Sequence, residues 1–427
     1  MGITRRDLIK ATAAGTALTG IGLPATALAG GTKTIKLGFL APLTGDVAGW
    51  GLPGLYGVEV LLKQFINAKG GVKIGNDTYM LEVASYDNQY LPDKALVGYK
   101  KLVNEEKVKY IMMLGGDPWP GVQRYCNHAK MMTTTLLPSD LSPDTPYLLA
   151  PCEVHPIYNV TGVEYLHKTY PEAKTAVICA QNDSLGQPSV ATYEAAFQAV
   201  GIEVVGENIF DPSTTDFAPI VSSLMAKKPD IFCFDTSYPD FINLICQQLL
   251  NQGFKGIKIA CTCDNYKQII QKTSLEFMKG FIYQFPDFDD PKLEHHVMNF
   301  PDPNKFYEEY NKAHPGTWTA VSWEYPSIVM QWIKGAQLAK STEPMDVLNA
   351  MLGQPTWPHI YGEAKWWGKE LWGINHALVG NWPVVVINDE GKARIQEFGN
   401  IPAWWAKNSD LLMKTMRARK LLWNQRT

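Results

Sequence analysis

The sequence lacks the features that usually bind nucleic acid or cross a membrane. It carries 39 Lys and Arg residues against 42 Asp and Glu, which gives a formal net charge of −3, and it has no long basic run. Nucleic-acid binding depends on Lys and Arg contacts to phosphate, so we expect no nucleic-acid partner. The apolar run over residues 11–23 is too short to span a bilayer.

Common enzyme motifs are also missing. The sequence contains no G-x-S-x-G nucleophile elbow, no Walker phosphate loop, no H-E-x-x-H zinc motif and no G-x-G-x-x-G fingerprint. We therefore expect a protein that is not an enzyme, with no catalytic residues and no cofactor.

Cysteines are few for a chain of this length, and their number is odd. Such a set does not form a disulfide scaffold, although a bridge between Cys126 and Cys152 is possible. Cys261 and Cys263 have C-x-C spacing without a second cluster or a nearby His, so we expect buried strand cysteines rather than a metal site. The seven lie at Cys126, Cys152, Cys179, Cys233, Cys246, Cys261 and Cys263.

One segment resembles a metal-binding cluster. His295 and His296 stand beside Glu294, close to Asp289 and Asp290. Adjacent histidines on a loop diverge unless the backbone folds specifically around an ion, and the segment is also typical of a solvated connector. We therefore expect no bound metal.

The N-terminal residues resemble an export signal. Residues 4–10 (Thr-Arg-Arg-Asp-Leu-Ile-Lys) are similar to the twin-arginine motif, and Ala27-Leu28-Ala29 follows the apolar run with the small residues that a signal peptidase accepts. We expect residues 1–29 to be a twin-arginine signal peptide that is cleaved near Ala29. Residues 30–427 would then act in the periplasm.

The remaining chain predicts alternating strands and helices. Apolar runs such as residues 35–40 and 231–235 predict buried strands, and apolar residues at i, i+3, i+4, i+7 and i+8 predict a helix over residues 55–68. Such alternation indicates an α/β fold with parallel sheets. The length exceeds the roughly 250–300 residues of a single core, so we expect two doubly wound parallel-sheet lobes.

We assign the expected lobes and the hinge between them as follows. Lobe 1 comprises residues 30–153 and 286–358, and lobe 2 comprises residues 154–285 with the C-terminal residues 359–427. The three hinge segments would lie near residues 152–156, 284–288 and 355–362. Ligands of open α/β sheets bind in the crevice at the carboxyl ends of the strands, so we expect the site between the lobes.

Several motifs resemble one known family. They are residues 35–38 (Ile-Lys-Leu-Gly), 42–45 (Pro-Leu-Thr-Gly), 66–72 (Ile-Asn-Ala-Lys-Gly-Gly-Val), 86–88 (Tyr-Asp-Asn), 115–116 (Gly-Gly), 182–186 (Asn-Asp-Ser-Leu-Gly) and 210–219. Together they are similar to the leucine/isoleucine/valine-binding proteins, the type I periplasmic binding proteins of branched-chain amino acid transporters. The resemblance implies a small-molecule ligand, and partners in an ABC permease and ATPase complex. The alternative is a ligand-sensing protein that is coupled to a membrane receptor or regulator.

The resemblance also implies a set of cleft residues. Asp117 stands where the family has a hydroxyl and would repel a ligand carboxylate, and Thr262 replaces an acid that binds the ligand ammonium, although Asp264 could take that role. Trp50 and Tyr238 would supply flat apolar walls. We therefore expect either an amino acid or an aromatic or amide-like relative. The implied ligand-binding residues are Trp50, Asp117, Ser139, Leu185, Ser237, Tyr238, Thr262, Asp264 and Ala320.

Overall fold

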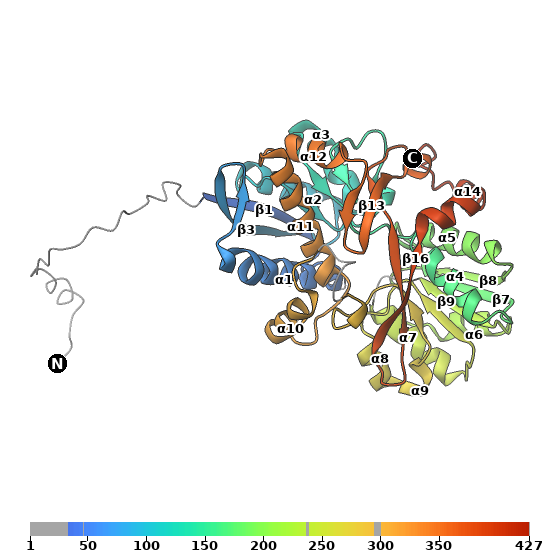
Figure 1. The fold of residues 1–427 in the computed structure, drawn as a ribbon. Coiled ribbons are helices and arrows are strands. Elements are labelled where there is room, and N and C mark those ends of the chain that lie inside the picture. The colour runs from blue at the N-terminus through green and yellow to red at the C-terminus, as the bar shows by residue number, and fades with distance from the viewer. Residues whose placement is uncertain (1–32, 46, 236–238, 294–299, 427) are drawn as a thin grey trace, which may run out of the picture. The chain divides into compact units, whose positions relative to one another are not determined.

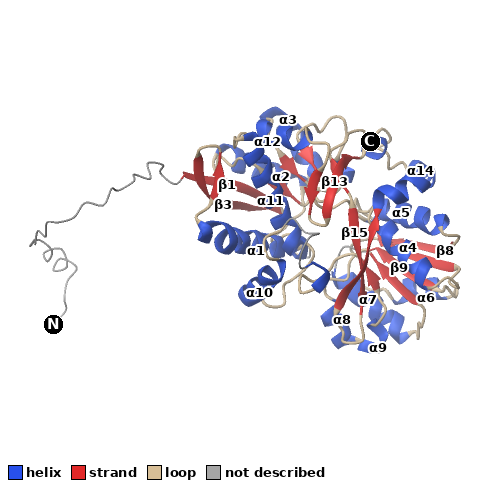
Figure 2. Ribbon diagram, in the orientation of Figure 1, coloured by secondary structure: helices blue, strands red, loops and turns tan. Residues whose placement is uncertain are grey.

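The computed structural model describes residues 33–45, 47–235, 239–293 and 300–426 (Figure 1). Its strands form two large sheets and one small sheet. The larger sheets consist mainly of parallel strands with helices between them (Figure 2), so the prediction of a two-lobed α/β fold is confirmed. None of the described helices combines the length and the apolar character that crossing a membrane requires.

The first sheet is built around a strand whose side chains are almost all buried. From Ile35 to Ala41 this strand is covered on both faces, which is typical of parallel sheets. Its parallel neighbours on either side are β3 and β4, and β2 joins β3 as an antiparallel hairpin. In spatial order the strands are β2 (Val72–Ile74), β3 (Asp77–Asp87), β1 (Lys33–Ala41), β4 (Ile111–Met113), β5 (Thr133–Thr134) and β6 (Leu148–Leu149).

Helices from two distant parts of the chain are associated with this sheet. The helix predicted over residues 55–68 is α-helical only as far as Val60; a π-helical turn over Leu61–Ile66 and a 3-10 turn over Asn67–Lys69 continue it. In Figure 1, α11 lies beside α1, because the chain returns to this sheet after the second one. The helices are α1 (Leu52–Val60), α2 (Pro92–Asn104), α3 (Trp119–Ala129), α10 (Pro303–Ala313), α11 (Val321–Ala339) and α12 (Pro344–Leu352).

The second sheet has five parallel strands and two antiparallel strands at one edge. The parallel strands β7 to β11 alternate with helices, and β15 and β16 form the antiparallel pair. In spatial order the strands are β16 (Ala393–Asn400), β15 (Asn381–Ile387), β11 (Ile282–Tyr283), β10 (Ile257–Ala260), β9 (Ile231–Asp235), β7 (Thr175–Gln181) and β8 (Glu203–Phe210). The helices are α4 (Asn159–Thr169), α5 (Gly186–Ala199), α6 (Ala218–Met225), α7 (Pro239–Asn251), α8 (Tyr266–Lys272) and α9 (Leu275–Met278).

The C-terminal part adds a small sheet and a long helix. The small antiparallel sheet contains β12 (Trp357–His359), β13 (Gly362–Trp367) and β14 (Ala377–Val379), with the short helix α13 (Lys369–Trp372) between the last two. The final helix α14 (Ile401–Ala418) packs on α5. All seven cysteines are buried free thiols, so the possible bridge between Cys126 and Cys152 does not form.

Candidate functional site

A cavity of about 680 Å³ lies where the carboxyl ends of strands from both large sheets meet. Asp117 and Ser139 line it from loops of the first sheet, and Asp183 and Ser184 line it from the loop between β7 and α5. Two of the predicted site residues, Asp117 and Ser139, therefore share this cavity with residues of the second sheet. We call it the first cavity.

The segment after α14 closes one side of the first cavity. Leu421, Trp423 and Arg426 line it, and the Arg426 guanidinium donates a hydrogen bond of 3.0 Å from Nη2 to the carbonyl oxygen of Leu141. Because α14 packs on α5 and Leu141 follows β5, this segment connects the two sheets.

A second cavity of about 530 Å³ lies between the N-terminal end of α1 and the loop before α8. Gly49 and Leu52 line it on one side, Asp264 and Lys267 on the other, and Trp318 completes the wall. Asp264 is thus another predicted site residue that faces a cavity. We call it the second cavity.

The other predicted residues within the described ranges are buried. Trp50 ends the 3-10 turn after β1, Leu185 precedes α5, and Thr262 follows β10. Ala320 is the N-cap of α11, and its backbone N–H hydrogen-bonds to the Asp264 carboxylate, so two predicted site residues are in contact. The predicted residues Ser237 and Tyr238 lie outside the described residues.

Several buried polar atoms at these positions have no hydrogen-bond partner among the described residues. They are Trp50 Nε1, Ser139 Oγ, Ser184 Oγ, Asp264 Oδ2 and Thr319 Oγ1. Most buried polar groups in proteins are hydrogen-bonded, because leaving one unpaired costs about 1–3 kcal/mol. Ser139 and Ser184 line the first cavity, whereas Asp264 and Thr319 line the second.

Burial raises the pKa of several carboxyl groups near these residues, Asp264, Glu153 and Glu324 among them. For Asp264 the value is about 7, because burial outweighs the hydrogen bond from Ala320. The pKa of Glu153 is also about 7, because burial outweighs the attraction of His155 and the 2.9 Å hydrogen bond from the Tyr158 hydroxyl. For Glu324, burial and the neighbouring Glu153 raise the pKa well above its ordinary value.

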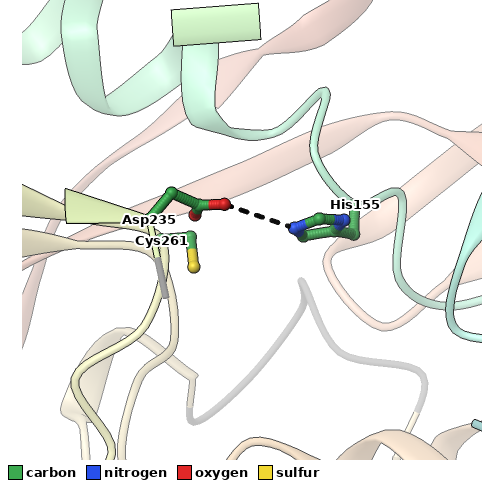
Figure 3. A group of neighbouring side chains, drawn as sticks. All are labelled: His155, Asp235 and Cys261. Carbon is green, nitrogen blue, oxygen red and sulfur yellow. Dashed lines mark ion pairs between the residues drawn. The ribbon is translucent and has the colours of Figure 1, made fainter. Parts of the chain in front are cut away.

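His155 faces Asp235 next to this acidic group (Figure 3). Its Nε2 atom lies 3.8 Å from Asp235 Oδ2 and 3.3 Å from Ser189 Oγ. Burial opposes protonation of the ring, but the Asp235 carboxylate outweighs it and raises the pKa of His155. Asp235 and Ser189 both contact Nε2 of His155, whereas a catalytic triad needs the acid on one ring nitrogen and the hydroxyl on the other. This arrangement therefore does not form a proton relay for Ser189.

A group of buried titratable residues surrounds His155 that was not predicted from the sequence. Its members are Glu153, His155, Asp235 and Glu324, all buried. Two of them carry a signal in the sequence: Asp235 ends the apolar strand Ile231–Asp235, and Glu324 lies between the aromatic residues Trp323 and Tyr325. A charged residue at the carboxyl end of a parallel strand points to the ligand crevice.

A family model described as periplasmic binding protein matches residues 34–392. The chain belongs to the periplasmic binding protein family. Proteins of this family are extracytoplasmic binding proteins for small molecules, not enzymes. The resemblance identified from the sequence motifs is thus confirmed.

A known relative of this periplasmic binding protein is distant in sequence. A Leu/Ile/Val-binding protein, BraC3 of Rhizobium johnstonii, is 24% identical over 224 residues, which cover 50% of this chain and 58% of the relative. The match therefore spans less than two thirds of that protein's length.

Solved structures share the fold at lower identity. A leucine-binding protein LivK from Thermotoga maritima has a TM-score of 0.68 at 16% identity, covering 86% of this chain and 99% of its own. A solute-binding protein of an ABC transporter from Rhodopseudomonas palustris BisB5, in complex with 3,4-dihydroxybenzoic acid, has a TM-score of 0.70 at 16% identity, with coverages of 86% and 98%. A fatty acid ABC transporter substrate-binding protein from Thermomonospora curvata has a TM-score of 0.70 at 19% identity, with coverages of 89% and 94%.

Proposed function

We propose that this protein is the substrate-binding component of an ABC importer, which captures a small organic solute between its two lobes. The observation that carries the proposal is the set of buried, unpartnered polar atoms contributed by loops of both sheets, among them Ser139 Oγ and Ser184 Oγ. The relatives, which include a Leu/Ile/Val-binding protein and ABC transporter solute-binding proteins, support the same role.

The charge of the site favours a solute with an ammonium group or with amide N–H donors. The Asp264 carboxyl offers an oxygen, Oδ2, that has no hydrogen-bond partner among the described residues. A buried carboxylate is stable when a cation or a donor pairs with it. Asp264 thus takes the role of the acid that Thr262 replaces, and the apolar part of the solute would pack on Trp50 and Leu185.

We also propose an export route for this protein and its partners in transport. Residues 1–29 act as a twin-arginine signal peptide, and the rest of the chain works in the periplasm with an ABC permease and ATPase complex. Solute binding closes the lobes about segments near residues 152–156, 284–288 and 355–362, because the closed state adds contacts from both lobes. The permease recognises the closed state.

Binding is tested by thermal shift and calorimetry on chelator-treated protein lacking residues 1–29. The panel contains zwitterionic amino acids, amides, amines and hydroxybenzoates. We expect an ammonium or amide compound to bind; at 1,000 times its dissociation constant it stabilises the protein by about 4 kcal/mol. Stabilisation by hydroxybenzoates alone would refute the charge argument, and a panel without any binder would refute the proposed function.

Two variants locate the site within the protein. Trp50→Ala removes an aromatic wall and should weaken binding about tenfold or more. Asp264→Asn removes the carboxylate and should weaken binding of ammonium compounds more than that of amides. Asp216→Asn, on the exposed turn before α6, is the control and should leave binding unchanged. Unchanged affinity in Trp50→Ala and in Asp264→Asn would remove these residues from the site.

A further inference from the structure

The ends of two neighbouring strands place an acid and a thiol side by side. β9 and β10 are parallel with Phe234 opposite Ala260; Asp235 is the last residue of β9 and Cys261 directly follows β10. Both side chains are buried, with at most 1% of their surface exposed. They face a common space that His155 enters from the segment before α4 (Figure 3).

The three side chains are close enough to share one ion. One donor atom from each of His155, Asp235 and Cys261 lies within 4.8 Å of the other two, and His155 Nε2 is 3.8 Å from Asp235 Oδ2. Ligands of one tetrahedral zinc ion, at bond lengths of about 2.0–2.3 Å, lie roughly 3.3–3.7 Å apart. Small side-chain movements would therefore bring all three donors to bonding distance.

A second observation points to a cation at this position. Asp235 is completely buried, and neither of its carboxylate oxygens has a hydrogen-bond partner among the described residues. The Nδ1 atom of His155 is also buried without a partner there. The contact of Nε2 with Ser189 Oγ is 3.3 Å long, and a metal–nitrogen bond would replace it. The His155 ring that faces Asp235 lies 3.8 Å away, beyond hydrogen-bonding distance, so a metal ion between them would pair more closely with the buried carboxylate.

We propose that His155, Asp235 and Cys261 bind a divalent transition-metal ion such as Zn²⁺, Co²⁺ or Ni²⁺. Imidazole, carboxylate and thiolate form a donor set that favours these borderline ions over Mg²⁺ or Ca²⁺, which prefer oxygen ligands alone. Three protein ligands leave a tetrahedral ion one further position for water or a donor atom of the solute. The site does not depend on the proposed transport role.

Cobalt(II) provides a direct test because a thiolate bound to it gives a charge-transfer band in the near ultraviolet. We titrate chelator-treated protein without a histidine tag with Co²⁺ alone under anaerobic conditions. One ion per chain should bind with this band, and Zn²⁺ should displace it. Absence of a saturable 1:1 complex with a thiolate band would overturn the proposal.

Substitutions at the three residues test which side chains bind the metal ion. In Cys261→Ala the band should disappear, and in His155→Ala or Asp235→Asn the affinity for Co²⁺ should fall about tenfold or more. The control is Cys246→Ala, a buried thiol of α7 outside the cluster, which should retain the band. A band that survives in Cys261→Ala would overturn the assignment. If Cys261→Ala does not fold, the proposal is tested by the thiolate band of the wild type and by the Co²⁺ affinity of Asp235→Asn.

The result of the cobalt titration is independent of the result of the solute-binding panel. Solutes that bind chelator-treated protein in the absence of a 1:1 cobalt complex would leave the proposed function intact and refute the metal site. Cobalt binding with no solute binding would support the metal site and refute the proposed function.

Discussion

At the scale of single residues, Glu324 is the least expected group in the molecule. It lies in the buried helix α11 between two aromatic residues, with none of its surface exposed. Burial and the adjacent Glu153 disfavour its charged form and raise its pKa well above the ordinary value. The native protein therefore keeps a proton there that the unfolded chain releases above about pH 4.5.

This proton makes stability depend on pH. A raised carboxyl pKa in the native state means that the free energy of unfolding falls as pH rises above the unfolded value. We expect Glu324→Gln to flatten the fall in melting temperature between pH 5 and pH 8, measured by calorimetry on chelator-treated protein.

The control for this measurement is Glu308→Gln, at an exposed position of α10. It should follow the wild-type curve. Parallel curves for wild type and Glu324→Gln would show that Glu324 does not hold the proton.

Part of the candidate site was predictable from the sequence at this scale. The motif resemblance selected Asp117, Ser139 and Asp264, which line the two cavities; whether they bind the solute remains a prediction. The titratable group around His155 was not predicted, because its members come from different segments and only the fold brings them together. Hydrophobic periodicity carries no information on such distant pairings.

At the scale of elements, the packing of α1 on α11 depends on two glycines. A Cβ added at Gly57 would overlap the carbonyl oxygen of Ser322, and one at Gly54 would overlap the ring of Tyr325. The backbones can approach closely only because these side chains are absent. This contact joins segments that are far apart in the sequence.

We expect Gly57→Ala to destabilise the protein by about 1–2 kcal/mol. The overlap costs about 1–3 kcal/mol, and the better helix propensity of alanine returns up to about 1 kcal/mol. The midpoint of urea unfolding measures the effect. Gly49→Ala is the matched control, because a Cβ there meets nothing within 4 Å. Equal midpoints for the two variants would contradict this account.

Helices and strands with a clear hydrophobic pattern were predictable from the sequence, whereas elements defined by tertiary contacts were not. The apolar run of β9 agrees with the prediction over residues 231–235. The helix expected over residues 55–68 changes to a π-helical turn at Leu61, which a 3.6-residue period cannot anticipate. Helix α14 was not predicted.

At the scale of the whole molecule, the segment after α14 should favour the closed form. Arg426 carries the hydrogen bond to Leu141 from the segment that follows α14, and α14 itself packs on α5 of the second sheet. We expect Arg426→Ala to lower solute affinity about fivefold, because one hydrogen bond contributes about 1 kcal/mol to the closed state. Isothermal calorimetry measures this change.

The comparison is with Arg417→Ala, at an exposed position of α14. This variant should bind as wild type does. If both variants bind equally well, the terminal segment does not contribute to closure.

The position of Trp423 has an optical consequence. Trp423 is 37% exposed and lines the first cavity, as Asp117 does. Indole emission shifts to shorter wavelengths when water leaves the ring. The difference in emission between the wild type and Trp423→Phe would therefore follow the filling of this cavity in real time, so the protein carries its own fluorescent reporter for measuring association rates without a dye.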